Sequence, residues 1–141
     1  FKKLIQAYRE IGSEAGHASQ ELKVGAHSWG WIAEDGEQAV KDYFHPTKQV
    51  VDAISKDRPH WQELRYEQYL EQVGPDGAMF VGNPDQVAEK LIRMIEDLGL
   101  YRFMLHLPLG SMPHEQVLRA IELFGTQVAP KVRAYFAMKE A

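Results

Sequence analysis

The side chains that could bind a ligand fall in two short stretches of the sequence. They are an imidazole, a hydroxyl and an indole in the first stretch, and an imidazole followed by a glycine and a serine in the second: His27, Ser28, Trp29, His106, Gly110 and Ser111. Each stretch lies at the end of a run that reads as a β-strand. In parallel α/β folds, ligand sites lie beyond the carboxyl ends of the strands. We therefore expect the two stretches to meet at one end of a sheet.

These residue types are suited to hydrogen bonding and to anion binding. His27 and Ser28 can donate hydrogen bonds to a bound cofactor or substrate. Gly110 and Ser111 can offer backbone N–H groups to an anion at the start of the helix that Pro113 opens. The pattern therefore indicates a ligand site with a polar side and an anion-binding loop.

The same residues also have structural alternatives. His27 can be a core histidine bonded to a backbone carbonyl, and His106 can pack against outer helices. Ser28 and Ser111 can cap local backbone, and Gly110 can serve a turn that needs a positive φ. The residues alone leave both interpretations open.

Two strands separated by helical segments must position these residues. Residues 21–33 carry few charges after Lys23, which is typical of a strand that is buried on both faces in a parallel sheet. Residues 101–107 read as the second strand, and residues 78–81 as a short extended run. Strands that alternate with helices predict an α/β fold with parallel strands.

Helices are predicted from apolar periodicity and from the residues that start or stop a helix. The expected segments are a first helix ending at Gly16, one from Asp35 to about Lys56, one from Pro59 to about Val73, one from Asn83 to Leu98, one from Pro113 to Phe124, and one from Thr126. Pro46 should kink or break the second of these helices. Gly125 should end the fifth.

Composition excludes several classes of protein. The chain has 141 residues, a formal net charge of −4 and no cysteine. A mildly acidic chain lacks the positive charge that nucleic-acid binding needs, and without cysteine there are no disulfides or thiolate metal sites. The six histidines are scattered without an i, i+4 pair, so no metal site is expected. No apolar run approaches about 20 residues and no signal-peptide pattern is present, so we expect a cytoplasmic protein.

The chain reads as a part of something larger. Two long strands do not make a stable parallel sheet alone, because such a sheet needs several members and cover on both faces. The sequence also begins at Phe1 without an initiator methionine. We therefore expect residues 1–141 to be a fragment of a larger α/β protein.

Three runs of residues carry a resemblance to a known family. They are LKVGAHS at 22–28, GPDGAMFVGNPDQVAEK at 74–90, and RFML at 102–105 followed by PHEQVLR at 113–119 and ELFGT at 122–126. In this order they resemble the seventh strand, the turn and helix before the last strand, and the last strand with the closing helices of a barrel. The family is that of the bacterial luciferase-like monooxygenases, which are flavin-dependent oxidoreductases built on a TIM barrel.

The resemblance implies a fold, a cofactor and a set of site residues. Residues 1–141 would be the C-terminal portion of a single (β/α)8 barrel domain that binds reduced FMN or a deazaflavin at its C-terminal mouth. The protein would be a monooxygenase or oxidoreductase for an organic substrate and a homo-oligomer, with NAD(P)H taking part indirectly. The implied site has His27 as the catalytic residue that can move a proton, Ser28, Gly110 and Ser111 as cofactor-binding residues, Trp29 and His106 as substrate-binding residues, and Trp31 as a further wall of the pocket.

Two other functions stay open at this point. A non-catalytic relative would bind flavin without turnover, and a small α/β module acting by protein association would bind none. The isolated fragment is predicted to be inactive, to bind FMN weakly or not at all, and to self-associate, because its strand edges and apolar faces would be uncovered.

Overall fold

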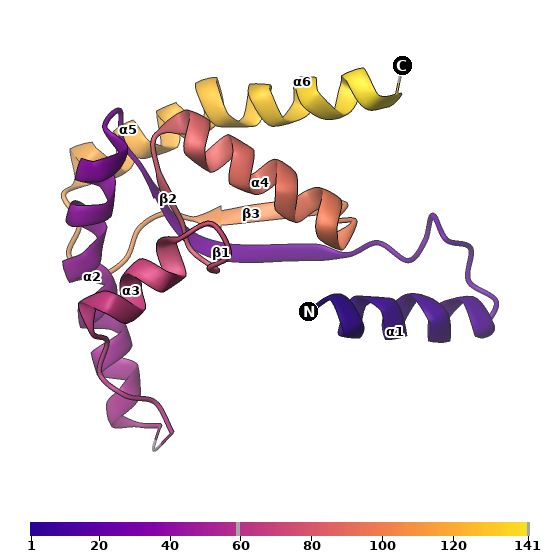
Figure 1. Cartoon of the computed structure of the whole chain (residues 1–141), viewed down its shortest axis with the longest axis horizontal. Coiled ribbons are helices and arrows are strands. Elements are labelled where there is room, and N and C mark those ends of the chain that lie inside the picture. Colours follow the sequence, from indigo (N-terminus) through magenta and orange to yellow (C-terminus); the bar gives the residue numbers. More distant parts are fainter. Residues whose placement is uncertain (59, 141) are drawn as a thin grey trace.

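The computed structural model describes residues 1–58 and 60–140 and consists of a three-stranded sheet with helices around it (Figure 1). In chain order the elements are α1 (Lys2–Glu14), β1 (Gly25–Ile32), α2 (Gly36–Lys56), α3 (Tyr66–Val73), β2 (Phe80–Gly82), α4 (Pro84–Leu98), β3 (Arg102–His106), α5 (His114–Leu123), the π-helix η1 (Phe124–Val128) and α6 (Ala129–Glu140). Among the helices described, none has the length and apolar character that crossing a membrane requires.

The three strands run parallel in the order β2-β1-β3. β1 pairs with β3 along Gly25–Trp29. Its last three residues, Gly30–Ile32, pair with β2. Helices connect the strands, as the alternating pattern of the sequence predicts, so the predicted α/β class with parallel strands is confirmed.

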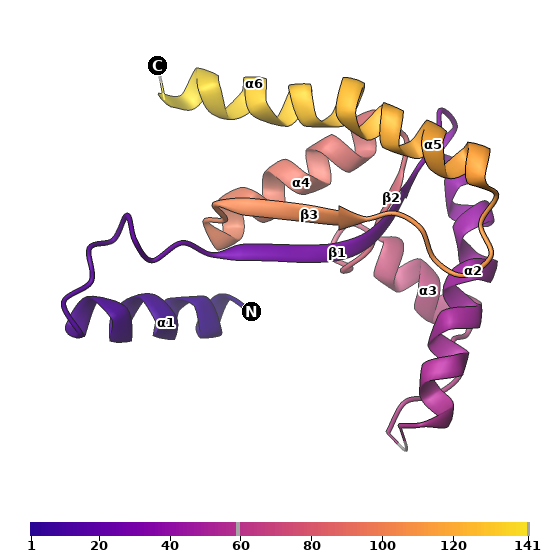
Figure 2. The same ribbon diagram turned by 180° about the vertical axis from the view of Figure 1, so that it is seen from behind.

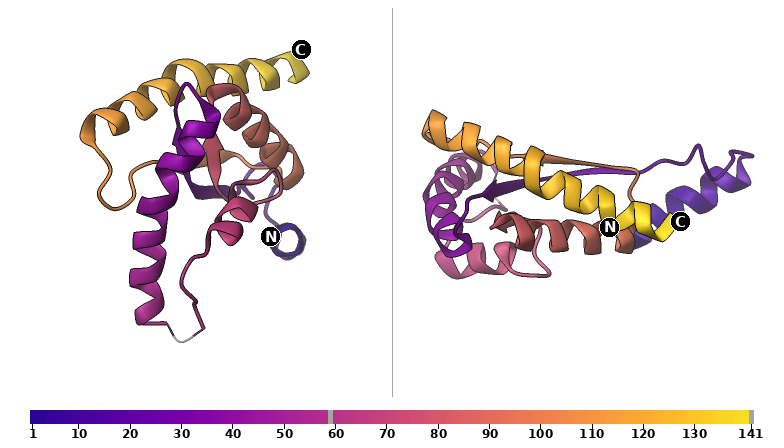
Figure 3. Two further views of the ribbon diagram at one scale, coloured as in Figure 1. Left: turned by 60° about the vertical axis from the view of Figure 1, so that its left-hand side comes forward. Right: turned by 90° about the horizontal axis from the view of Figure 1, so that it is seen from above.

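The hydrophobic core lies around the C-terminal end of β1. Trp31, Ile32 and Phe80 are all buried there. Gly30 lets β2 approach β1 closely, because a Cβ at this position would overlap the carbonyl oxygen of Phe80 and the side chain of Leu105. Helices α2, α3 and α4 surround this end of the strand (Figure 3).

α2 begins as the sequence predicts and then continues through a proline. The Asp35 side chain accepts hydrogen bonds from two N–H groups of the first turn. The helix does not break at Pro46, where the sequence predicts a kink or a break. Pro46 and Thr47 are buried, and the Thr47 hydroxyl donates to the carbonyl oxygen of Tyr43 at 2.6 Å. Tertiary packing therefore outweighs the cost of about 3 kcal/mol that an interior proline imposes on a helix.

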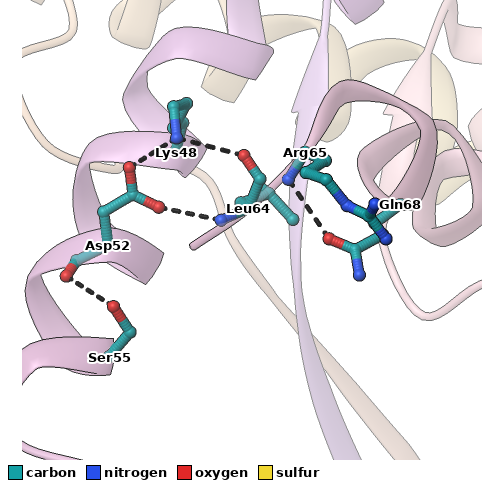
Figure 4. Close-up of polar contacts among 6 residues, drawn as sticks. All are labelled: Lys48, Asp52, Ser55, Leu64, Arg65 and Gln68. Atoms are coloured by element: carbon teal, nitrogen blue, oxygen red, sulfur yellow. Dashed lines mark hydrogen bonds and ion pairs between the residues drawn. The ribbon is translucent and has the colours of Figure 1, made fainter. Parts of the chain in front are cut away.

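The segment before α3 is not helical, although the sequence predicts a helix from residue 59 onward. Residue 59 itself lies outside the described residues, and α3 begins only at Tyr66. The main chain of Leu64 is instead bound by α2, because its N–H donates to Asp52 at 2.8 Å and its carbonyl accepts from Lys48 at 3.1 Å (Figure 4). A 2.6 Å ion pair joins Lys48 to Asp52. These contacts use the N–H and the carbonyl of Leu64, which a longer helix would need for its own backbone hydrogen bonds.

α4 has the bounds that the sequence predicts. The Asn83 side chain accepts from the N–H of Gln86 at 3.0 Å, and the Gln86 side chain accepts from the N–H of Asn83 at 2.9 Å. Gly99 ends the helix with a φ of 61°. The buried side chains of Val87 and Leu91 form the face that packs on the core.

The C-terminal helices form one continuous rod, so the predicted stop at Gly125 is wrong (Figure 2). Gly125 lies inside η1, where a Cβ would meet nothing within 4 Å. The Thr126 hydroxyl donates to the carbonyl oxygen of Glu122 at 2.7 Å. Leu123 and Val128 are fully buried on the inner side. Their burial holds the rod helical across a residue that favours a stop.

α1 lies beside the N-terminal end of β1, away from the core (Figures 1 and 2). The Arg9 guanidinium donates to the carbonyl oxygen of Gly99 at 2.7 Å, which ties α1 to the end of α4. The apolar side chains of Leu4 and Ile11 remain 68% and 66% exposed. The amphipathic pattern therefore formed a helix whose apolar stripe is largely uncovered by the described residues.

Candidate functional site

β1 and β3 share an open face that carries several of the predicted ligand-binding side chains. Exposure alternates along β3, where Met104 and His106 are exposed, and along the first residues of β1, where His27 is exposed; Trp29 is half-buried. In the parallel register His27 lies opposite Met104, and Trp29 lies opposite His106. Because alternate residues of a strand point to the same face, His27, Trp29 and His106 share the open face. His106 ends β3 as predicted, but β1 continues to Ile32, so His27 lies in the amino-terminal half of β1 and not at its carboxyl end, where the sequence predicts it.

Ser28 lies on the opposite face of β1. Its hydroxyl donates a hydrogen bond to the carbonyl oxygen of Ala78, in the turn before β2. Its register partner in β3 is Leu105, which packs against the core. Ser28 is therefore separated from His27 by the thickness of the strand, and its hydroxyl joins the sheet to the turn.

Gly110 and Ser111 lie in the loop between β3 and α5, against the side of α2. Gly110 has a φ of 55°, and a Cβ there would lie 3.5 Å from the carbonyl oxygen of Pro46. The Ser111 hydroxyl donates to the Gln49 side-chain oxygen at 3.2 Å. The residue that precedes α5 is Pro113, and no side chain caps that helix. Ser111 therefore links the loop to α2 rather than capping the following helix.

Trp31 belongs to the core, 2% exposed, and stacks on Tyr43 of α2 with ring centroids 5.8 Å apart. Tyr43 is also fully buried, and its hydroxyl has no hydrogen-bond partner in the described part of the chain. Burial raises the pKa of this hydroxyl well above its ordinary value, and the nearby Tyr69 raises it further. Tyr43 therefore stays neutral at physiological pH.

Sequence reasoning missed two side chains, the partner of the loop, Gln49, and a buried ammonium, Lys90. Tyr43 was predicted to face inward from its helix, and its burial is confirmed. Lys90 did leave a signal, because it interrupts the apolar face of α4 one turn after Val87. Nothing in the sequence marks Gln49 as the partner of a loop more than 60 residues away.

Within the described residues, no group of three or more His, Cys, Asp or Glu side chains could hold a metal ion. The site consists instead of an open strand face with two imidazoles and an indole, and a loop at its carboxyl end. Such a surface can bind a flat organic ring and can place hydrogen-bond donors along its rim.

Solved structures share this fold. The chain matches the monooxygenase RslO1 from Streptomyces bottropensis with a TM-score of 0.69 and 22% identity, over 92% of this chain and 37% of that one. It matches the oxygenating constituent of 3,6-diketocamphane monooxygenase from Pseudomonas putida, in complex with FMN, with a TM-score of 0.58 and 20% identity, over 93% and 39%. It matches the coenzyme F420 dependent tetrahydromethanopterin reductase from Methanopyrus kandleri with a TM-score of 0.57 and 19% identity, over 89% and 40%.

These likenesses establish the fold. No family model matches the chain, and no curated protein matches its sequence. The chain spans between 37% and 40% of the length of the three solved structures. The predicted resemblance to luciferase-like monooxygenases is confirmed at the level of the fold, as is the predicted class, part of a (β/α)8 barrel.

Proposed function

We propose, from the fold that this chain shares with those oxidoreductases, that residues 1–141 form the C-terminal flank of a flavin-dependent barrel enzyme that oxygenates or reduces an organic substrate. The observation that carries the proposal is the open face of β1 and β3. It presents His27, Trp29 and His106 together on two adjacent parallel strands. Ligand sites of such barrels lie at the carboxyl ends of the strands, and here it is β3 that ends, at His106 opposite Trp29.

The side chains present fit one side of a flavin. The ring system of a flavin is flat, with an apolar part and a hydrogen-bonding edge. On the open face, the indole of Trp29 and the thioether of Met104 offer apolar contact, and the imidazoles of His27 and His106 offer hydrogen bonds. The bound FMN or deazaflavin would supply the electron transfer, with NAD(P)H taking part indirectly.

The chain's own residues would then bind, orient and exclude water. His27 would hydrogen-bond the flavin or the substrate and would hold or move a proton at its imidazole. Trp29 and His106 would contact the substrate, and the indole would keep water from the face. The exposed loop at Gly110 and Ser111 would direct backbone N–H groups at an anionic part of the cofactor.

Ser28 takes a different place in this proposal. Its hydroxyl already donates to the carbonyl oxygen of Ala78 on the other face of β1. It would therefore serve the cofactor indirectly, by fixing the strand that carries His27 and Trp29 on its open side.

The test uses a protein that carries this chain together with the remaining barrel strands. His27→Ala should lower turnover or flavin affinity by about 100-fold, which is the lower range for a lost acid or base. In the 141-residue chain, where His27 is exposed, the same substitution should change the melting temperature little. The measurements are flavin retention, substrate-dependent consumption of NAD(P)H and oxygen, and thermal unfolding.

The matched control is His17→Ala, which removes an exposed imidazole from the segment after α1. It should leave both flavin binding and turnover unchanged. A normal specific activity for His27→Ala with a large loss of stability would refute its catalytic role. Flavin binding without consumption of NAD(P)H or oxygen would identify the protein as a non-catalytic relative.

A further inference from the structure

Three backbone carbonyl groups converge on the ammonium of Lys90. Its Nζ donates to the carbonyl oxygens of Val73 at 3.1 Å, Gly74 at 2.5 Å and Met79 at 2.6 Å. The same nitrogen lies 5.3 Å from the centre of the Phe80 ring. Lys90 is only 9% exposed. An ammonium has three N–H donors, so all of them are used by the main chain.

The three carbonyls belong to the turn that connects α3 to β2. Val73 is the last residue of α3 and Gly74 follows it, so two of the acceptors lie at the negative end of that helix. The N–H of Met79 donates to the carbonyl oxygen of Gln72 at 2.9 Å, which closes the turn. Gly77 is required inside it, because a Cβ there would overlap the carbonyl oxygen of Gln72. The turn thus gathers carbonyl oxygens in one place.

A lysine in this position carries a cost. Burial, together with the neighbouring Arg93, lowers the pKa of Lys90 to about 8, while Asp76 acts in the opposite direction. The group therefore keeps its positive charge at neutral pH. Convergent carbonyl oxygens are the ligands that proteins offer to a bound monovalent cation, and they compensate here for the water that the ammonium has lost.

We propose that the turn at residues 73–79 is a cation site made of main-chain carbonyls, and that Lys90 fills it as a tethered cation. The class of ligand that the site accepts is a primary ammonium ion. The site does not depend on flavin binding and lies outside the open face of β1 and β3.

The filled site supports β1 through the turn. Ala78, inside the turn, accepts the hydroxyl hydrogen bond of Ser28. The turn leads directly into β2, which pairs with Gly30–Ile32 of β1. Without the cation, three carbonyl groups would face one another unpaired, and the turn would separate from the strand that it supports.

The test is chemical rescue of a truncated side chain in the 141-residue chain. Lys90→Ala removes three carbons and the ammonium, which together correspond to n-propylammonium. We expect Lys90→Ala to lower the melting temperature by about 5 to 10 °C, as unpaired buried acceptors would. Adding n-propylammonium should restore most of that loss, at fixed protein concentration and ionic strength.

Four controls separate a cation site from a general effect. 1-Propanol has nearly the same shape without the charge, and sodium chloride supplies ionic strength without an ammonium; neither should restore the melting temperature. Lys90→Met fills the channel with an apolar side chain, so it should be destabilised and should not respond to n-propylammonium. Lys41→Ala removes an exposed lysine from α2 and should resemble the unmodified chain.

Two results would overturn the proposal. One is a Lys90→Met variant as stable as the unmodified chain, which would show that the carbonyls need no cation. The other is equal recovery of Lys90→Ala with 1-propanol and with n-propylammonium. If Lys90→Ala does not fold in buffer, the yield of refolding with and without n-propylammonium replaces the melting temperature, and equal yields would count against the site.

Discussion

β1 lies in two different environments along its eight residues. Its last three residues, Gly30–Ile32, are buried, and they pair with β2 after the chain has made the excursion through α2 and α3. In its first half, Gly25 and His27 are exposed although they pair with β3. The chain therefore completes its own core at the closed half of β1, Gly30–Ile32. In the open half, Gly25–Trp29, it leaves Gly25 and His27 exposed, while Trp29 is half-buried against the core.

The difference shows which part of the fold is self-sufficient. Parallel sheets are normally covered on both faces, and a barrel strand has a neighbour on each edge. The open half lacks that cover, and it is also where the proposed ligand-binding face lies. Stability and function are therefore expected to depend on opposite ends of the same strand, which the following variants test.

The largest expected difference is between a closed-half residue and an open-face residue. Trp31→Ala should lower the free energy of unfolding by about 3–5 kcal/mol, because it empties a core position that stacks on Tyr43. Met104→Ala should change it by no more than about 0.5 kcal/mol, because Met104 is 54% exposed. Denaturant unfolding of both variants measures the contrast. Similar losses would mean that the open face is covered in solution.

Two glycines of β1 give the same contrast in the backbone. Gly30→Ala should cost about 1–3 kcal/mol, because its Cβ would overlap the carbonyl oxygen of Phe80 and push β2 away. Gly25→Ala should be neutral or stabilising by up to about 1 kcal/mol, because its Cβ would meet its nearest atom at 3.7 Å, an ordinary contact. Thermal unfolding of both variants measures the difference in stability between them. A destabilised Gly25→Ala would place a close neighbour on the open half.

The open face is also proposed to drive self-association of the chain. A glutamate at Met104 would have to lose water without a partner when two copies meet there. Met104→Glu should therefore weaken self-association by about tenfold, which corresponds to about 1.4 kcal/mol. Light scattering over a range of concentrations measures it. Met138→Glu, at an exposed residue of α6, is the control and should leave the assembly intact. An unmodified chain that stays monomeric would show that the open face does not drive self-association.

The smallest expected effect concerns the polar edge of α2. Hydrogen bonds from Lys48 and from the N–H of Leu64 hold the pKa of Asp52 below its ordinary value. A carboxylate whose pKa is lower in the folded state stabilises the fold above its unfolded pKa, and the effect is lost as pH falls through the folded pKa. Asp52→Asn should therefore melt slightly lower than the unmodified chain at about pH 7, and the difference should shrink below about pH 4.

The control for this pH dependence is Asp57→Asn, at the end of α2. Asp57 is exposed and does not bind the main chain of Leu64, so its replacement should not reproduce the loss of melting temperature that Asp52→Asn shows at about pH 7. A difference between Asp52→Asn and the unmodified chain that does not depend on pH would contradict the role of the ionised carboxylate.

Much of the fold could be predicted from the sequence because many of its helix ends and strands depend on residues that are close together in the chain. The cap at Asn83, the stop at Gly99 and the cap at Asp35 satisfy backbone groups within a few residues, and all three function as predicted. The strands of low charge were likewise found with their parallel pairing. Local hydrogen bonding and the hydrophobic period determine these features independently of contacts with distant parts of the chain.

The errors have one common cause, which is contact between distant residues. Pro46 and Gly125 disfavour helix locally, yet buried neighbours such as Thr47 and Val128 hold the helices through them. The segment before α3 lost its predicted helix because Asp52 and Lys48 bind the main chain of Leu64. Burial and side-chain bonds from another element outweighed intrinsic propensity in each case.

The candidate site divides in the same way. By itself, the sequence determined the residue types and the two strands. It led to the prediction of His27 and Ser28 in one ligand site, although a period of two places neighbouring residues on opposite faces of a strand, as the structure shows for these two. Only the tertiary structure decided that His106 meets Trp29 across the strands and that Lys90 collects the carbonyls of a turn. The physical reason is that strand register and the end of a long side chain depend on partners many residues away.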